Sequence, residues 1–534
     1  MVQPILVAMT PTFRGKAAVS ADKVRGGYYT PPAVASFLAR WVAEAGGKVL
    51  EPSCGDGRIL RELVTVADDV QGVELVPEEA AKAREFGPVA EGSLFDWLGA
   101  NQHGKWDGVA GNPPYIRFGN WDTSHRQPAL DLMSSVGLRP SKLTNAWVPF
   151  TVASALATRD GGRVGLVIPA ELMQVTYAAQ LREYLLTSFS EITLVTFERL
   201  VFDGILQEVV LFLGVKGEGP ARMRTLPLRE ASDLVSADLD VPSAPALLHD
   251  HEKWTKYFLA PKHIDLLRAL RASDELMPLG KLASVDVGIV TGRNSFFTLS
   301  DKQVRDLGLV EHVSPLVSRG AQLSGILYDG DSRTQDLATN LRTWILDAPK
   351  ELGGHPVLAE YVASGERDGV HTGFKCSIRK PWWRTPSMWV PEAFMLRQIH
   401  LAPRVTANTA GATTTDTVHR IRMLDGNDPV ALAVAFHNSA TFAFTEVMGR
   451  SYGGGILELE PREAELLPMP SPKHVTPELA ADVDMLLKSG EVEKALELVD
   501  RHVLVGALGW APERVDACRA AWTTLRDRRT ARRR

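Results

Sequence analysis

The sequence is poor in cysteine and contains no long hydrophobic run. Three cysteines, at positions 54, 376 and 518, are spread over 534 residues, and none belongs to a CxxC pair. This spacing argues against both a disulfide framework and a zinc site, so we predict reduced thiols and no metal. No window approaches the roughly 20 apolar residues of a membrane span, and the N-terminus lacks a secretory layout. We therefore expect a cytoplasmic protein without a membrane segment.

An overall excess of positive charge is also missing. The formal net charge is −5, which by itself argues against a nucleic-acid partner, because neutralising phosphates requires Lys and Arg. Between Val370 and Met423, however, eight basic residues stand against two acidic ones, a local balance of +6. A solvated surface is the commoner origin of such an excess, but a patch of this size is also what a phosphate-binding surface requires.

Short apolar runs alternate with helical patterns between Lys48 and Gly214. This rhythm is typical of βαβ units and predicts an α/β fold with a mostly parallel sheet. The last two runs are separated by only ten residues, too few for a helical crossover, so we expect that pair to be antiparallel. The seven predicted strands are residues 48–52, 70–76, 87–95, 106–112, 162–169, 191–197 and 208–214.

The rhythm changes after Gly214. Residues 232–254 are rich in Ser, Asp and Pro, as linkers are, and the following short strand candidates, glycines and prolines predict a second, α+β domain. The end of the chain has a helical pattern and a basic tail, RDRRTARRR. The predicted organisation is an N-terminal extension (1–25), a first domain (26–231), a linker (232–260), the α+β domain (261–472) and a helical C-terminal segment (473–534).

Four clusters of chemically useful residues follow consecutive predicted strands. LEPSCGDG (50–57) ends the first strand in a glycine-rich turn, and Glu74 ends the second, where a carboxylate can bind both ribose hydroxyls of a nucleoside. After the third strand, Asp96 can accept from an adenine amino group while Trp97 covers a base face, and NPPY (112–115) follows the fourth strand. In open α/β sheets, these carboxyl ends form the ligand-binding edge.

Two phosphate-binding patterns are absent from the same region. A dinucleotide site prefers a third glycine where this sequence has Leu60, and the Gly-Lys-Ser/Thr of a phosphate loop does not occur. An adenosine ligand without phosphates is consistent with both absences. We therefore predict S-adenosylmethionine as the ligand.

In their order and spacing, the four clusters resemble motifs I to IV of the gamma-class DNA adenine methyltransferases, the TaqI-like and Eco57I-like enzymes. GGYYTPPAVASFLARW (26–41) resembles motif X, and RLVFDGILQEVVLFLG (199–214) resembles motif VIII, whose aromatic residue is Phe202. The resemblance implies a class I methyltransferase fold: a seven-stranded, mostly parallel sheet with its last strand antiparallel, followed by a C-terminal α+β target-recognition domain. It also implies that the cofactor S-adenosylmethionine is bound by Tyr29, Thr30, Pro31, Glu51, Pro52, Cys54, Gly55, Gly57, Glu74, Asp96, Trp97 and Asn112.

The same resemblance implies a reaction and a set of partners. The expected reaction is site-specific methylation of the N6 atom of an adenine that is flipped out of double-stranded DNA. The expected setting is a type II restriction-modification system, in which this chain is the modification enzyme, a monomer, and the cognate endonuclease is encoded separately.

The chemistry explains why an asparagine and two prolines stand together. An adenine amino group is a poor nucleophile because its lone pair is delocalised into the ring. If the Asn112 side-chain oxygen and the Pro113 carbonyl accept its two hydrogens, the nitrogen is drawn toward a tetrahedral geometry, and the rigid diproline holds both acceptors in place beforehand. Tyr115 and Phe202 are the rings predicted to stack on the flipped base. The predicted catalytic residues are Asn112, Pro113, Pro114 and Tyr115.

Segments of the second domain resemble the target-recognition domain of the same enzymes, more loosely: residues 285–300, 377–387, 404–421 and 453–472. Their basic side chains can reach phosphates, and their Thr and Asn side chains can read base edges. We expect Trp382 and Trp383 to be core residues. The predicted DNA contacts are Arg117, which follows NPPY, and Thr291, Arg293, Asn294, Arg379, Lys380 and Arg384.

Three other functions share part of this pattern. Methyltransferases that act on another planar nitrogen, in a protein glutamine or an RNA guanine, also carry NPPY, but usually without an addition like the some 300 residues that follow the first domain here. A non-catalytic DNA-binding subunit would keep the fold, and the intact NPPY argues against it. A combined restriction and modification enzyme needs a nuclease domain, and only about 25 residues precede motif X.

Overall fold

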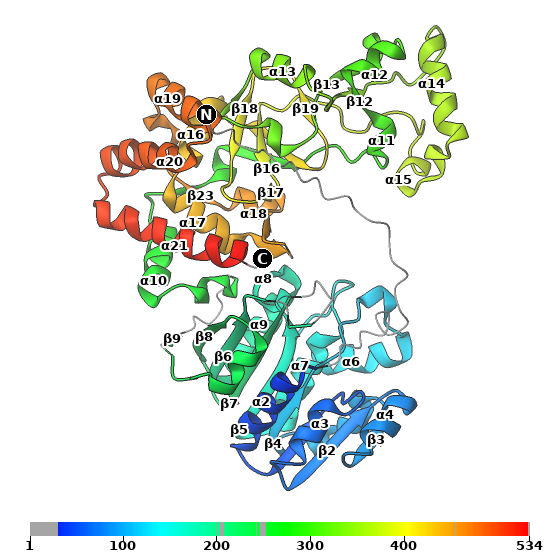
Figure 1. Ribbon diagram of the computed structural model, residues 1–534, viewed down its shortest axis with the longest axis vertical. Helices are drawn as coiled ribbons and strands as arrows, with labels where there is room; N and C mark the ends of the chain where they lie inside the picture. The colour runs from blue at the N-terminus through cyan, green and yellow to red at the C-terminus, as the bar shows by residue number, and fades with distance from the viewer. Residues whose placement is uncertain are drawn as a thin grey trace, which may run out of the picture. The chain divides into compact units, whose positions relative to one another are not determined.

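The computed structural model describes residues 30–199, 201–202, 208–241, 243–245, 253–452 and 454–531. Contacts within the chain divide it into two compact units (Figure 1). The first comprises Met1–Leu172 and Thr176–His251, and the second comprises Met173–Val175 and Glu252–Arg534. The main division therefore falls inside the predicted linker, 232–260. The predicted N-terminal extension and Tyr29 lie outside the described residues.

One sheet forms the framework of the first unit. Its strands are β1 (Lys48–Glu51), β2 (Asp69–Glu74), β3 (Val89–Glu91), β4 (Trp106–Gly111), β5 (Thr158–Pro169), β6 (Phe189–Phe197), β7 (Val209–Lys216), β8 (Arg222–Leu228) and β9 (Ala244–Pro245). Their order is β3-β2-β1-β4-β5-β7-β6-β8-β9. The first five strands in this order run parallel to one another, and β7 is antiparallel to both β5 and β6. The expected antiparallel pairing of the last two predicted strands is thus confirmed.

The described sheet contains all seven expected strands and two more. β8 pairs parallel with β6, and β9 pairs antiparallel with β8. The sequence of β8, RMRTLPL, mixes basic and apolar residues and includes a proline. It lacks the continuous apolar run of a strand buried on both faces, which is why the sequence pattern did not reveal it.

The first part of the predicted linker belongs to the core of the first unit. Ala231–Ser236 forms the 3-10 helix η4, and Leu234 within it is 2% exposed. It joins the same buried cluster as Phe37 and Leu213. The expectation of a linker is therefore wrong for this stretch, because its Ser and Asp residues surround a leucine that packs inward.

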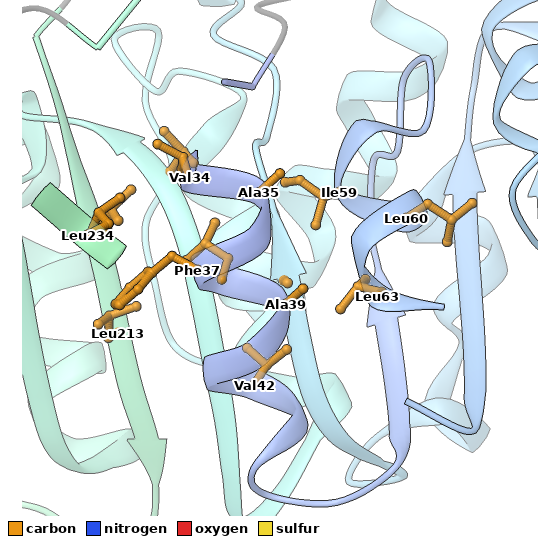
Figure 2. Close-up of a cluster of buried hydrophobic side chains, with 14 of the residues drawn as sticks. Val34, Ala35, Phe37, Ala39, Val42, Ile59, Leu60, Leu63, Leu213 and Leu234 are labelled. Carbon is orange, nitrogen blue, oxygen red and sulfur yellow. The ribbon is translucent and has the colours of Figure 1, made fainter. Parts of the chain in front are cut away.

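Helix α2 covers part of the sheet and leads directly out of the segment that contains Thr30. It begins with Pro32, whose fixed φ suits the first turn of a helix. Figure 2 shows its apolar side chains between those of α3 on one side and Leu213 and Leu234 on the other. The helices of this part of the chain are α2 (Pro32–Ala43), α3 (Arg58–Leu63), α4 (Pro77–Ala83), α5 (Leu94–Leu98), α6 (Thr123–Ser135), α7 (Trp147–Ala157), α8 (Glu171–Gln174) and α9 (Ala179–Ser188).

The second unit is a mixture of short strands and helices, with no βαβ rhythm. Its strands are β10 (Met277–Pro278), β11 (Ala283–Val287), β12 (Thr298–Ser300), β13 (Val313–Val317), β14 (Leu327–Tyr328), β15 (Arg342–Leu346), β16 (Ala393–Leu396), β17 (Gln398–Ile399), β18 (Val405–Asn408), β19 (Thr413–Thr414), β20 (Val418–Met423), β21 (Arg450–Tyr452), β22 (Ile456–Glu458) and β23 (Pro468–Met469). The larger described sheets have the orders β11-β20-β16-β18-β14 and β12-β15-β13-β19.

Helices make up much of the rest of this unit. They are α10 (Pro261–Ala272), α11 (Asn294–Phe297), α12 (Asp301–Asp306), α13 (Gly330–Leu337), α14 (Pro356–Arg367), α15 (Phe374–Ser377), α16 (Pro429–Phe436), α17 (Ser439–Met448), α18 (Pro461–Glu465), α19 (Pro477–Lys488), α20 (Val492–Val499) and α21 (Pro512–Ala531). Among the described residues, no helix is both long enough and apolar enough to span a bilayer.

The basic tail contributes a buried ion pair. Within α21, the Arg529 guanidinium donates to both carboxylate oxygens of Glu446, at 2.6 and 3.0 Å, and both side chains are only 3% exposed. The guanidinium also donates to the His400 carbonyl at 2.8 Å. One residue of the basic tail therefore fixes α21 against α17.

We predict that Arg529→Met destabilises the protein by about 3–5 kcal/mol, because it leaves the Glu446 carboxylate buried without its partner. Chemical denaturation measures this loss. The control is Arg501→Met, which removes the same charge from an exposed position and is expected to change stability by less than about 0.5 kcal/mol. Equal effects of the two substitutions would show that the buried pair contributes nothing particular.

Candidate active site

A cavity lies at the carboxyl ends of strands β1, β2 and β4 in the first unit. This is the edge at which parallel α/β sheets bind ligands. The structure brings together eight residues that the sequence places in the site. These lining residues are Thr30, Glu51, Pro52, Cys54, Gly55, Glu74, Asn112 and Pro114.

Other site residues predicted in the first unit do not line the cavity. They are Pro31, Gly57, Asp96, Trp97, Pro113, Tyr115 and Phe202. The placement of Asp96 and Trp97 departs from the expectation for a local reason. β3 ends early, and Ser93 caps a new helix, α5, by accepting from the Phe95 amide at 3.3 Å. Successive helical residues point in different directions, so Phe95 faces the cavity, Asp96 is exposed, and Trp97 packs against Trp106 with ring centroids 6.1 Å apart.

Glu74 joins the turn after β1 to the end of β2. Its Oε2 accepts from the Gly55 amide at 2.8 Å, and its Oε1 accepts from the Val76 amide at 2.9 Å. Gly55 has φ +52° and Gly57 has φ +83°, and a Cβ on Gly57 would lie 2.9 Å from the Ala83 Cα. The left-handed backbone favours glycine at both positions of this turn, and at Gly57 close packing against α4 also leaves no room for a side chain.

Two carboxyl groups face the cavity from neighbouring strands. Burial, with the nearby Glu74 as the second cause, raises the pKa of Glu51 well above the ordinary value. Burial also raises the pKa of Glu74, although the amides of Val76 and Gly55 partly oppose this shift. Within the described residues, Glu51 Oε2 and Ser53 Oγ are buried without a hydrogen-bond partner. Buried polar atoms usually have a hydrogen-bond partner. The site is therefore suited to a ligand that carries hydrogen-bond donors.

An apolar wall completes the cavity, and it was not predicted from the sequence. It consists of Phe95, Ile116, Trp121 and Phe150. The Phe95 ring meets Phe150 edge-on at a centroid distance of 4.9 Å and Trp121 at 6.5 Å. A wall of this kind suits the flat face of a purine. The LFDW segment does show that an aromatic residue follows β3. Whether Phe95 or Trp97 faces the cavity depends on where β3 ends and α5 begins.

The Asn112 amide is held by hydrogen bonds at both ends. Its Nδ2 donates to the Thr30 hydroxyl at 3.2 Å, and the Tyr115 hydroxyl donates to its Oδ1 at 3.0 Å. The Tyr115 hydroxyl also lies 3.0 Å from the Val167 carbonyl of β5. Phe202 is 4% exposed, and Tyr115 packs against the hydrophobic cluster that contains it. The two rings predicted to stack on the base thus share one cluster beside Asn112.

Arg379 in the second unit is occupied by internal hydrogen bonds. Its Nε donates to the Lys375 carbonyl at 2.8 Å, its Nη1 donates to the Arg384 carbonyl at 3.2 Å, and its Nη2 donates to the Thr291 carbonyl. The guanidinium also lies 5.3 Å from the Phe297 ring centroid. Arg379 therefore holds residues 375–384 together and joins them to the segment of Thr291 and Phe297.

Thr291 is also a structural residue here. It is 1% exposed, and its hydroxyl contacts Asn294 Oδ1 at 2.5 Å and the Arg293 amide at 3.2 Å. The predicted DNA contacts that remain exposed are Arg117 in the first unit and Arg293, Asn294, Lys380 and Arg384 in the second.

Both expected core tryptophans pack in the second unit. Trp382 and Trp383 lie against the hydrophobic cluster that includes Phe296 and Phe297. Their indole nitrogens donate to Glu366 Oε1 at 3.1 Å and to the Pro349 carbonyl at 3.2 Å. Both rings are thus partly buried, and they pack against the edge of this core cluster rather than within it.

Two family models match the chain in succession. Residues 69–202 match the Eco57I restriction-modification methylase model, and residues 251–504 match the C-terminal domain of the type II methyltransferase M.Eco57I. The type II methyltransferase M.AccI of Acinetobacter calcoaceticus is 21% identical over 82% of this chain and 83% of its own length. M.XamI of Xanthomonas campestris pv. amaranthicola, also a type II methyltransferase, is 22% identical over 84% of this chain and 85% of its own length.

A solved structure shares the fold over most of the chain. The type IIL restriction-modification enzyme MmeI, solved in complex with DNA, aligns with a TM-score of 0.55 at 13% identity. The alignment covers 93% of this chain and 75% of that one.

We predict that the ligand-free Glu51→Gln variant is more stable than the wild type, and that this difference in unfolding free energy grows as the pH rises. Because the folded-state pKa of Glu51 is raised, its contribution to stability is complete below the ordinary value of 4.5 and is lost as the pH rises through the raised value. Glutamine is neutral throughout. Thermal unfolding from about pH 5 to about pH 9 measures the difference. The exposed Glu85→Gln serves as the control, and parallel curves for Glu51→Gln and the wild type would contradict the prediction.

Proposed function

Because the chain is an Eco57I-like restriction-modification methylase with S-adenosylmethionine as its cofactor, we propose that it methylates the N6 atom of an adenine in double-stranded DNA. The observation that carries this proposal is the Asn112 amide in the lining of a cavity that also contains carboxyl groups and an apolar wall. The first unit has the class I methyltransferase fold, and its parallel strands end at this cavity.

The cavity residues fit the proposed cofactor by their chemistry. Glu74 at the end of β2 is placed to accept from ribose hydroxyls, and Phe95 is placed to cover an adenine face. The buried Oε2 of Glu51 lacks a partner among the described residues, and an ammonium group would satisfy it. When bound, S-adenosylmethionine supplies an electrophilic methyl group.

The residues of NPPY supply acceptors for the substrate amino group. Asn112 Oδ1 and the Pro113 carbonyl accept its two hydrogens, which localises the nitrogen lone pair, and the two prolines fix both acceptors before the base arrives. Tyr115 and Phe202 offer aromatic faces that replace the stacking lost when the base leaves the duplex, a contact of roughly 1–3 kcal/mol for each base. Both rings pack in the same hydrophobic cluster in this structure. The proposed role requires each ring to expose one face to the flipped base.

The second unit is proposed to recognise the DNA. From Gly369 to Pro391 it contains four Lys or Arg residues and no Asp or Glu. Arg379 is used internally, and Lys380 and Arg384 remain exposed beside it. Phosphate contacts by exposed cations give affinity without sequence preference, and base-edge contacts supply the specificity. We propose that the chain acts as a monomer and that a separate endonuclease recognises the same sequence.

We predict that Asn112→Ala lowers the rate of methyl transfer by at least roughly 100- to 1,000-fold, the usual effect of removing one preorganised polar group at a reacting centre. Cofactor and duplex binding are expected to persist. The assay uses labelled S-adenosylmethionine and unmethylated DNA, followed by single-molecule sequencing to map the modified base. Asn101→Ala, at an exposed position of the same unit, is the control. Unchanged turnover by Asn112→Ala would rule out the proposed mechanism, and a modified base other than adenine would rule out the substrate.

We also predict that the double substitution Lys380→Gln with Arg384→Gln weakens DNA binding and flattens its salt dependence. If both side chains contact phosphates, the slope of log K against log salt decreases by about two. Fluorescence anisotropy at several salt concentrations measures this slope. The control pair is Lys473→Gln with Lys494→Gln, two exposed lysines elsewhere in the same unit. Equal slopes for the test pair and the wild type would exclude these phosphate contacts.

A further inference from the structure

An exposed pair of apolar side chains lies on the short helix α15 of the second unit. Phe374 is 73% exposed, and Ile378, which follows the last turn of α15, is 64% exposed. The next most exposed phenylalanine among the described residues, Phe86, is only 37% exposed. Single exposed apolar residues are common in proteins. These two, however, are four positions apart, so one helical turn presents them on the same face.

The turn that carries this pair is firmly anchored. Cys376, which lies between the two residues, is 1% exposed and belongs to a hydrophobic cluster that joins α11, α14 and α15, three helices that Figure 1 shows close together. The amides of Cys376 and Ser377 both donate to the Gly373 carbonyl at 2.8 Å. The Arg379 guanidinium donates to the Lys375 carbonyl of the same turn, also at 2.8 Å. The pair therefore projects from a base that the fold holds in place.

Positive charge surrounds the pair. Lys375, Lys380 and Arg384 are exposed, and the Lys375 ammonium lies 5.6 Å from the Phe374 ring centroid. No Asp or Glu occurs between Gly369 and Pro391. An apolar face with a cationic border is complementary to a polyanion that has an apolar interior. Duplex DNA has this composition, because its phosphates lie outside and its stacked bases lie within.

The size of the apolar face argues against a protein partner. An aromatic side chain buries roughly 150–250 Å² when it is covered, and a stable protein interface buries about 800 Å² on each partner. Phe374 and Ile378 together supply about half of that area at most. They are also bordered by lysines, which are depleted in protein interfaces. An apolar wedge between two base pairs, in contrast, needs only one or two side chains.

We propose that Phe374 and Ile378 form an apolar wedge that inserts between two adjacent base pairs of duplex DNA and bends it. Phe374 stacks on a base that the insertion uncovers, and Ile378 fills the space beside it. Lys375 and Lys380 contact neighbouring phosphates. This inference rests on the proposed function, because it assigns the second unit a mode of contact with the same DNA. The contacts predicted from the sequence are all polar, and this one is not.

The test uses the full chain and a short duplex that the wild type selects from a random pool by affinity. Fluorescence anisotropy measures binding at several salt concentrations, and energy transfer between dyes at the two ends of the duplex measures bending. The test variant combines Phe374→Ala with Ile378→Ala. The control combines Leu466→Ala with Met485→Ala, which removes two apolar side chains of the same unit that are 56% and 60% exposed.

We expect the wild type to bend the duplex by roughly 20–90°, as apolar wedges do. The test variant is expected to bind about 5- to 100-fold more weakly, the loss that corresponds to one stacked base, and to leave the duplex straighter. Its slope of log K against log salt stays at the wild-type value, because no cation is removed. Phe374→Tyr keeps a ring face and is expected to bind within about threefold of the wild type.

Three results would overturn the inference. They are a duplex that the wild type leaves straight, a test variant that binds and bends the duplex like the wild type, and an equal loss of binding in the control. Sedimentation that changes in the test variant, with DNA binding unchanged, would instead assign the pair to an interface between copies of this chain. Thermal unfolding of each variant is expected to match the wild type, because these positions are exposed.

Failure of the proposed function would look different. The wild-type chain would then bind and bend the selected duplex without methylating an adenine in it, and the comparison of the wedge variants would still stand. A random pool from which the wild type retains no duplex would overturn both proposals.

Discussion

The candidate site depends on the hydrogen bonds that the Glu74 carboxylate accepts from two backbone amides. The carboxylate accepts from the Gly55 amide after β1 and from the Val76 amide after its own strand, β2. These bonds fix the glycine turn relative to the end of the second strand, at the edge where parallel strands place their ligands. Burial raises the pKa of this carboxyl, and the two amides oppose that shift by favouring the charged form. On balance the fold therefore disfavours the charged form of Glu74, and the two amides recover part of that loss.

The rest of the cavity combines unsatisfied polar atoms with an apolar wall. Glu51 and Ser53 contribute buried oxygens that lack partners among the described residues, while Phe95 and Phe150 contribute ring surface. Unpaired buried oxygens reduce the stability of the empty protein, and a bound ligand with suitable donors removes that penalty. The Asn112 amide in the lining of this cavity differs, because Thr30 and Tyr115 already satisfy both of its ends. Among the described residues, the proposed ligand-binding oxygens are thus free to accept from a ligand, whereas the proposed catalytic amide is already held in place by the protein.

Many basic residues in this chain have structural roles. Arg379 joins two segments of the second unit, and Arg529 pairs with a buried glutamate. Arg126 stacks on Phe118 at 4.2 Å and donates to its carbonyl at 2.8 Å. A count of local charge treats these side chains like exposed ones such as Lys380. It therefore overestimates the surface that can meet phosphate, and the internal hydrogen bonds of each guanidinium decide which cations remain available.

The sequence by itself determined the seven strands, the antiparallel end of that set, and the lining residues that follow β1, β2 and β4, because strand periodicity and turn residues are local properties. It expected Trp382 and Trp383 in a core, and both rings are partly buried against one. Tertiary structure decided the rest. Asp96 and Trp97 do not line the cavity, because Ser93 caps a short helix and so changes the directions in which the following side chains point. β8 forms by pairing with the edge of β6. The contact between Thr30 and Asn112 joins residues 82 positions apart, and a contact of that kind depends on how a helix packs across the sheet, which local patterns do not encode.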